Sequence, residues 1–170
     1  LAQFRSGLDF ARLVNLNLYA LNQFKEAGFL KDDMIHCLDS TELASECQKL
    51  LATIEIKGKK IRIYNDIDCD CGVRRKKRDK SVYVVGYRLH TLTAIDPATG
   101  HSYPLISLLA PANHHDSRFL GPIGELSRSL GLDVRLITAD EAYNDKNDEF
   151  YDKTGINIVK PASSKTGLPD

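Results

Sequence analysis

The chain has 170 residues, a length that predicts one domain with a sizeable hydrophobic core. Its 23 Lys and Arg balance its 23 Asp and Glu, so net charge argues neither for nor against nucleic acid, and the local distribution of charge matters more. No stretch approaches the roughly 18 uninterrupted apolar residues of a membrane-spanning helix, and the first residues lack the pattern of a secretory signal peptide.

The N-terminal part of the chain predicts a helix followed by a short strand. Apolar residues recur at helical spacing over residues 9–27, and Gly28 ends the pattern. We assign residues 1–33 to an N-terminal helical segment and residues 34–170 to the core domain. The apolar run 34–38 predicts a buried strand that stops at Asp39, which places a carboxylate at the end of rigid backbone.

Residues 57–80 are unusually basic, with ten Lys or Arg against four Asp, a local net charge of +6. The densest cluster consists of Arg74, Arg75, Lys76, Lys77, Arg78 and Lys80. Such groups bind DNA by neutralising phosphates, so the cluster is a candidate DNA contact. The alternative interpretation is a solvated charged surface without a partner. No aromatic residue interleaves with the cluster, so stacking on single-stranded bases is not indicated.

A β-hairpin is predicted next. Residues 82–95 are rich in β-branched and aromatic side chains, residues 96–100 have the composition of a turn, and residues 103–110 form the return strand. Side chains alternate along a strand, so Arg88 and His90 share a face. From that face they would reach DNA or a metal site; burial beside a helix is the competing account.

The remaining chain alternates between helix and strand. Helices are predicted over residues 119–130 and 145–154, and strands over residues 134–139 and 156–159. The first of these strands delivers Asp140 at its carboxyl end. This order predicts an α/β fold, a mixed sheet with helices on both faces, in which Asp39 and Asp140 lie at strand ends where sites in open sheets form.

Two carboxylates on strand ends suit metal-dependent phosphodiester chemistry. Mg²⁺ prefers hard oxygen ligands and keeps several waters, and a pair of such ions activates the nucleophile and stabilises the leaving oxygen. The position of Asp39 and Asp140 at strand ends also allows another interpretation, in which they cap turns or helix starts.

Four motifs, in order along residues 38–145, resemble those of DDE-type transposases of bacterial insertion sequences. They are Leu38-Asp39-Ser40-Thr41, the block from Gly86-Tyr87-Arg88-Leu89-His90 to Thr99-Gly100, Pro111-Ala112-Asn113-His114-His115-Asp116-Ser117, and Thr138-Ala139-Asp140-Glu141-Ala142-Tyr143-Asn144-Asp145. The resemblance implies an RNase H-like catalytic domain in which Asp39 and Asp140 are catalytic acids that hold Mg²⁺ (or Mn²⁺). It further implies double-stranded DNA as partner, both element ends and target, and a bacterial cytoplasmic protein associated with the nucleoid. A homodimer of the full-length protein is a candidate assembly.

One departure from the family concerns its third acid, a Glu on a helix after the last strand. Glu141 and Glu149 lie too early in the pattern. The chain starts at Leu1 without a Met and ends soon after the last strand, so we expect a fragment of a longer protein. We therefore expect the third acid beyond Asp170 and a fragment that is inactive alone.

Several alternatives stay open at this stage. A metal-dependent nuclease of the same fold would cut without joining, and a non-catalytic, domesticated DNA-binding module would keep the basic cluster while losing the acids. Asp66, Asp68 and Asp70 are rivals to Asp39 for the first catalytic acid, because they too precede the hairpin. A calcium loop at these Asp residues is disfavoured, because Arg78 stands where an EF-hand needs Glu.

Other metal-binding side chains give weaker signals. The spacing of the four cysteines, Cys37, Cys47, Cys69 and Cys71, does not fit a zinc knuckle. His114 and His115 are candidate ligands, although adjacent His residues on a loop more often cap a helix or orient neighbours.

Overall fold

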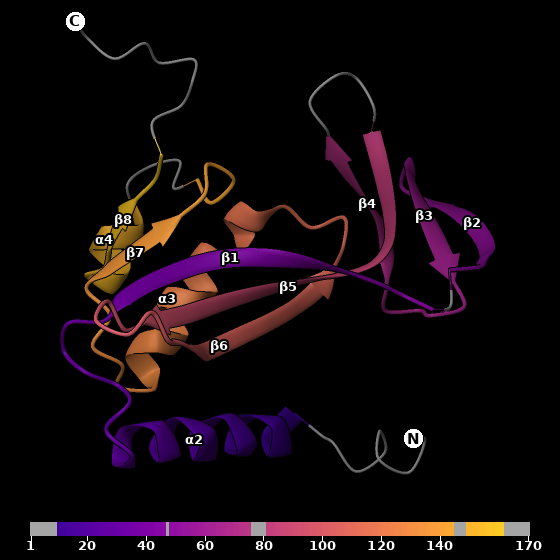
Figure 1. Cartoon of the computed structure of the whole chain (residues 1–170). Coiled ribbons are helices and arrows are strands. Elements are labelled where there is room, and N and C mark those ends of the chain that lie inside the picture. The colour runs from indigo at the N-terminus through magenta and orange to yellow at the C-terminus, as the bar shows by residue number, and fades with distance from the viewer. Residues whose placement is uncertain (1–9, 47, 76–80, 145–148, 162–170) are drawn as a thin grey trace, which may run out of the picture.

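The computed structural model describes residues 10–46, 48–75, 81–144 and 149–161, with the backbone alone at residues 10–14, 74, 75 and 81 (Figure 1). The elements, in chain order, are α2 (Phe10–Glu26), β1 (Ile35–Ala44), β2 (Leu50–Ile56), β3 (Lys59–Tyr64), β4 (Asp70–Arg75), β5 (Ser81–Ile95), β6 (Ser102–Pro111), the 3-10 helix η1 (Asp116–Arg118), α3 (Leu120–Ser129), β7 (Leu136–Ala139), α4 (Glu149–Thr154) and β8 (Asn157–Val159). No helix in the described ranges has both the length and the apolar character needed to cross a bilayer.

A six-stranded mixed sheet forms the centre of the molecule. Its order is β4-β5-β1-β7-β8, and β6 also pairs with β5. β5 is long enough to pair with β4 over its first half and with β6 over its second half. β1 pairs antiparallel with β5 and parallel with β7, and β7 pairs parallel with β8. The predicted mixed α/β architecture is confirmed.

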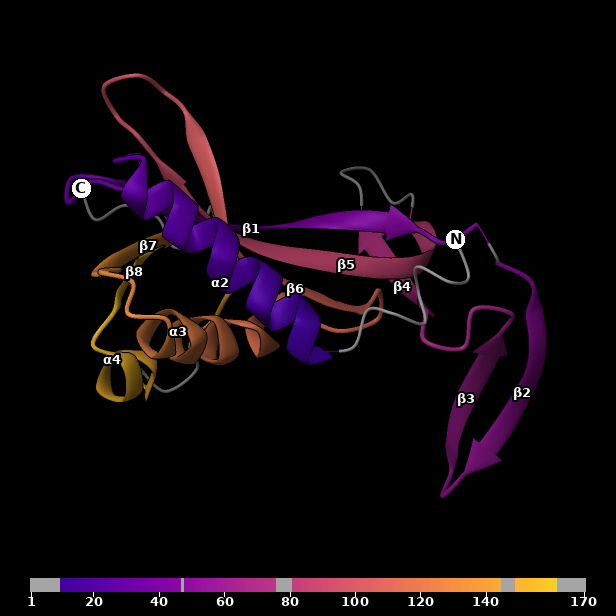
Figure 2. The same cartoon turned by 90° about the horizontal axis from the view of Figure 1, so that it is seen from below.

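The described helices cover one face of this sheet, not both. In Figures 1 and 2, α3 and α4 lie on one side of the sheet while α2 runs beside the edge strand β6. The prediction of helices on both faces is therefore wrong for the described residues. The cause is visible in the strands, where buried and exposed residues alternate as in a sheet with one solvated face. Large apolar side chains remain exposed, among them Ile35, Leu109 and Leu136.

The hydrophobic core lies between the sheet and the helices. Leu38, Leu92 and Ile137 come from three neighbouring strands and are 2%, 0% and 0% exposed. Register explains their common face, since Leu38 is paired with Leu92 across the antiparallel ladder. Ile123 of α3 and Tyr143 after β7 complete the core and are fully buried.

The helix α2 packs onto the same core. Its Leu21 is 4% exposed and belongs to the core cluster. Phe24 lies 5.7 Å from the ring of Tyr103 on β6, and Phe29, just after the helix, stacks on the same ring at 5.4 Å. Lys31 forms an ion pair with Asp96 at 2.7 Å, which ties the helix exit to the β5–β6 turn.

Most predicted elements are confirmed, and two regions differ. β1 continues to Ala44, beyond the predicted end at Asp39, because β5 goes on pairing with it along that whole length. The hairpin β2–β3 and the strand β4 occupy a stretch for which the sequence analysis predicted no element. The alternation of residues 53–63 around Lys57-Gly58 is a hairpin pattern that the high charge of the region obscured.

Candidate functional site

The parallel register between β1 and β7 brings the two predicted acids together. Cys37 of β1 is paired with Thr138 of β7, and Leu38 with Ala139. The next residues along the two strands are Asp39 and Asp140. Both line one open cavity of about 460 Å³. Its lining residues are Asp39, Ser40, Thr41, Glu42, Arg88, Asp116 and Asp140.

The cavity exists because β7 stops where β1 does not. β7 ends at Ala139 and the chain turns away at Asp140, whereas β1 continues to Ala44 with β5 as its partner. The space beside residues 39–42 of β1 is therefore free of a neighbouring strand. This is the edge at which sites form in sheets with parallel strands.

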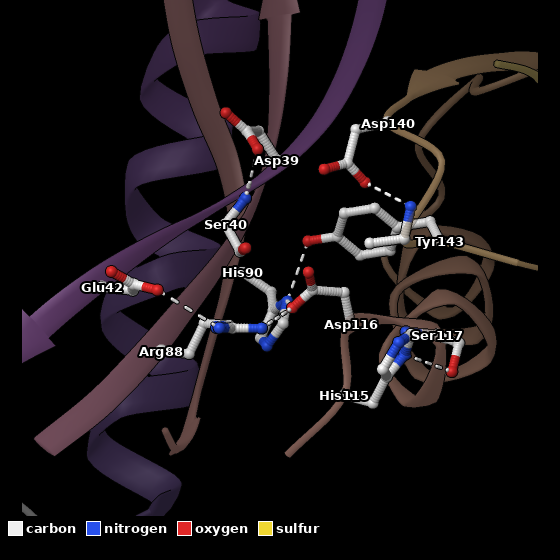
Figure 3. Close-up of polar contacts among 11 residues, drawn as sticks. Asp39, Ser40, Glu42, Arg88, His90, His115, Asp116, Ser117, Asp140 and Tyr143 are labelled. Atoms are coloured by element: carbon white, nitrogen blue, oxygen red, sulfur yellow. Dashed lines mark hydrogen bonds and ion pairs between the residues drawn. The ribbon is translucent and has the colours of Figure 1, made fainter. Parts of the chain in front are cut away.

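Each acid is fixed by one local hydrogen bond (Figure 3). The backbone N–H of Ser40 donates to Oδ1 of Asp39 at 2.7 Å, and that of Ala142 donates to Oδ1 of Asp140 at 2.9 Å. Asp140 therefore does cap a turn, as the alternative interpretation required. Both side chains are nevertheless exposed, and each uses one carboxylate oxygen in its local bond.

Arg88 reaches the cavity wall as part of an ion-paired group. Its Nη1 donates to Oδ1 of Asp116 at 2.7 Å and its Nη2 lies 3.4 Å from Oε1 of Glu42. The Arg88 side chain is 15% exposed and that of Asp116 is 9% exposed. Arg88 thus places a positive charge in the wall of the cavity, at a fixed position beside Asp116 and Glu42 (Figure 3).

His90 is buried and does not reach the surface. It is 0% exposed, its ring stacks on Phe119 at 3.8 Å, and its Nδ1 hydrogen-bonds the hydroxyl of Tyr143 at 2.8 Å. Burial lowers the pKa of His90 to about 4, so the ring is neutral at physiological pH. The predicted DNA contact of His90 is therefore corrected: Arg88 and His90 do share a face, but that face packs against the helices.

Tyr143 is fully buried and its hydroxyl hydrogen-bonds His90. Burial raises the pKa of its hydroxyl above the ordinary value, with the negative charge of Asp116 as the next cause, so the phenol stays protonated. Tyr143 and Asp116 both belong to the sequence motifs, but nothing in the sequence assigns either of them a role. No periodicity or charge pattern marks either residue, and their positions depend on the tertiary fold.

The basic cluster is represented only in part. Arg74 and Arg75 end β4, where their backbones pair with Val82 and Ser81. Lys76, Lys77, Arg78 and Lys80 lie outside the described residues. DNA contact by this cluster stays a prediction.

The rival acids occupy other places. Asp66 accepts hydrogen bonds from Oγ of Ser45 at 2.8 Å and from the hydroxyl of Tyr87 at 2.5 Å. Asp70 accepts one from Nδ2 of Asn113 at 2.6 Å. Neither these two residues nor Asp68 lines the cavity. Asp39 is the acid that accompanies Asp140.

The other candidate ligands are not assembled into a metal site. Cys37, Cys69 and Cys71 are free thiols, and Cys47 lies outside the described residues. His115 caps η1, because its Nδ1 accepts from the backbone N–H of Ser117 at 3.2 Å. Within the described ranges no group of three or more His, Cys, Asp or Glu side chains is arranged around a common metal position. The candidate site is thus a pair of acids, Asp39 and Asp140.

Comparison with known proteins adds no family to this picture: no protein-family model, no curated protein and no solved structure matches the chain.

Proposed function

We propose that this chain carries the catalytic core of a DDE-type transposase, which cleaves DNA at the ends of a mobile element and joins it to target DNA. One observation supports this most strongly. Motifs that lie up to a hundred positions apart in sequence contribute to a single cavity: Asp39, Arg88, Asp116 and Asp140 come from the four motifs in turn. Motif-like strings that matched by chance would have no reason to meet.

The sheet supports the same proposal. A central β1 with antiparallel β5 on one side and parallel β7 on the other is the kind of mixed sheet expected of an RNase H-like domain. It sets the first acid on the central strand and the second just after its parallel neighbour. An RNase H-like fold is part of the proposal.

The two acids fit a divalent metal. Carboxylate oxygens are the hard ligands that Mg²⁺ (or Mn²⁺) prefers, and Asp39 and Asp140 are exposed at one edge of a rigid sheet. When bound, such ions would supply an activated attacking oxygen and charge stabilisation at the leaving oxygen. Asp39 and Asp140 would hold the metal, and the third acid of the family remains an expectation for the sequence after Asp170.

The other cavity residues would position the DNA. Arg88 lines the same cavity as the two acids, and its fixed guanidinium would attract a phosphate there. Asp116 holds that guanidinium in place. His90 and Tyr143 are fully buried, do not line the cavity and stay uncharged, so neither adds charge to the site.

Metal binding by this chain tests the proposal directly. Asp39→Asn and Asp140→Asn should each weaken Mn²⁺ binding by about tenfold or more, since each removes one of two charged ligands. Titration calorimetry or Mn²⁺ paramagnetic resonance measures the change. Asp70→Asn is the matched control, because Asp70 is a rival acid that does not line the cavity. Equal Mn²⁺ affinity in all three variants would remove the basis of the proposal.

Activity assays separate the two neighbouring functions. In a full-length protein with a third acid, strand transfer of pre-cleaved ends distinguishes a transposase from a nuclease of the same fold. DNA binding that survives Asp140→Ala in a parent without cleavage activity would favour a domesticated binding module.

A further inference from the structure

The hairpin β2–β3, residues 50–64, extends from one end of the molecule as a separate two-stranded ribbon. In the described part of the chain its strands pair with each other and with no strand of the central sheet. Figure 2 shows it at the end opposite to α3 and α4. We call it the basic ribbon, because of the charge described next.

The ribbon concentrates positive charge on exposed positions. Residues 49–62 include five cations and one acid, Glu55. The cations are Lys49, Lys57, Lys59, Lys60 and Arg62, all exposed. None of them forms an ion pair with another residue of the described ranges. Their charge is therefore available to a partner.

The tip of the ribbon is a tight turn that carries three lysines. Lys57 and Gly58 both have positive φ angles, 51° and 74°, as a two-residue hairpin turn requires. Lys59 and Lys60 follow immediately. Cross-strand pairing then sets Thr53 opposite Arg62 and Glu55 opposite Lys60 on one face. Lys60 and Arg62 therefore share this polar face, Lys59 is paired with Ile56 on the other face, and Lys57 stands at the turn.

The root of the ribbon is held firmly to the central sheet. Tyr64 is 5% exposed, and the N–H of Asn65 donates to the carbonyl of Lys49 at 3.0 Å, which closes the base of the hairpin. Asp66 then accepts hydrogen bonds from Ser45 and Tyr87, residues next to β1 and on β5. Asp66 thus anchors the ribbon and does not line the cavity.

β1 connects the cavity to the ribbon. Asp39 lies on this strand and Ala44 ends it, and five residues of strand span about 17 Å. That length is about half of the roughly 34–36 Å turn of B-form DNA. Figures 1 and 2 show the ribbon beyond that end of β1, so a duplex lying along β1 with one phosphate at the cavity would meet the ribbon at least about half a turn away.

We propose that the basic ribbon is a second contact to double-stranded DNA, which binds phosphates at least about half a turn from the cavity; this rests on the proposed function. A two-stranded ribbon has the dimensions that the major groove admits. Phosphate neutralisation needs exposed, unpaired cations, which the tip supplies. The tip carries no aromatic side chain for stacking on unpaired bases, which favours a duplex over single strands. The opposite face, with Ile54, Ile56 and Ile61, would suit a second copy of the chain, and the test includes that outcome.

The test removes three tip charges: Lys57→Asn, Lys59→Gln and Lys60→Gln, with Asn at the position of positive φ because it tolerates that conformation. The control removes three exposed charges elsewhere, Lys25→Gln, Arg135→Gln and Lys153→Gln. Duplex affinity is measured by fluorescence anisotropy over a salt series. The ribbon variant should bind at least about tenfold more weakly, and its log–log salt slope should fall by roughly 2 to 3, since each phosphate contact contributes about 0.9. The control should stay within about twofold.

The outcomes separate the two proposals. The ribbon variant should keep its Mn²⁺ affinity, because no residue of the ribbon lines the cavity. Equal DNA affinity and slope in ribbon and control variants would overturn the ribbon contact while leaving the metal site intact. A changed sedimentation coefficient with unchanged DNA affinity would also overturn it, in favour of a self-association surface. If the ribbon variant binds DNA more weakly as expected, but Asp39→Asn and Asp140→Asn leave Mn²⁺ binding unchanged, only the proposed function would be overturned.

Discussion

The two halves of β1 lie in different surroundings. Residues 35–38 run between β5 and β7, and Leu38 in this half is 2% exposed. Residues 40–44 have β5 on one side and the open cavity on the other, and Leu43 in this half is 41% exposed. Asp39 stands at the boundary. One strand is therefore part of the core over its first half and part of a site over its second half.

This difference shows how a rigid strand can present a reactive group. The buried half fixes the direction of β1 through packing, and the absence of a β7 partner beyond Ala139 opens the cavity. The backbone of a catalytic acid at this position is held rigidly by the core, while its side chain stays exposed. The following predictions test that division of roles.

Truncating the two leucines of β1 should give unequal losses of stability. Leu38→Ala removes a buried side chain from the core cluster and should lower the free energy of unfolding by about 3–4 kcal/mol. Leu43→Ala, the same chemical change on the exposed half, should cost less than about 1 kcal/mol. Urea denaturation followed by circular dichroism measures both. Similar losses would mean that the two halves are not distinct.

The sequence could predict the buried half and not the open half. The apolar run 34–38 is a direct signal of a buried strand, whereas Ser40, Thr41 and Glu42 have no pattern that demands a strand. They are extended because β5 pairs with them, which is a tertiary effect. The convergence of Asp39 and Asp140 was predictable because each follows an apolar strand, and parallel strands end at one edge.

Other parts of the site depended on contacts that no local pattern encodes. The alternation of β5 correctly grouped Arg88 with His90, but alternation does not reveal which face the helices cover. His90 is buried because Phe119 and Tyr143 pack on it, and both lie far away in sequence. The role of Asp116 likewise requires the fold to bring it to Arg88, 28 positions apart. The high density of charge around residues 57–62 masks the alternation of the regular hairpin β2–β3.

Acid should weaken the core beneath the site. The pKa of His90 is lowered from 6.5 to about 4 in the folded protein, so the unfolded chain binds a proton more readily between these values. Stability should therefore be full above about pH 6.5 and fall as the pH decreases toward 4, by up to about 3 kcal/mol. Denaturation at several pH values, compared between the parent and His90→Gln, measures this contribution.

The control for this titration is a second histidine. Burial also lowers the pKa of His36, so it contributes in the same direction, and His36→Gln must be measured separately. The His90 variant should show a flatter dependence on pH than the parent between pH 6.5 and 4. If the curves of stability against pH for the parent and for His90→Gln run parallel, His90 has the same pKa in the folded and unfolded states.

A smaller effect than that of Leu38 or His90 is expected at the ion pair that links the core to the cavity. Arg88→Gln leaves the carboxylate of Asp116, 9% exposed, without its 2.7 Å partner and should lower the free energy of unfolding by about 2 kcal/mol. Glu42→Gln should cost less, because its contact to Arg88 is longer, 3.4 Å, and more exposed. In the double variant Arg88→Gln with Asp116→Asn, the loss should be smaller than the sum of the single losses, since no unpaired buried charge remains. Additive losses would mean that Arg88 and Asp116 are not coupled, and Arg88 would then have no fixed position from which to attract a phosphate.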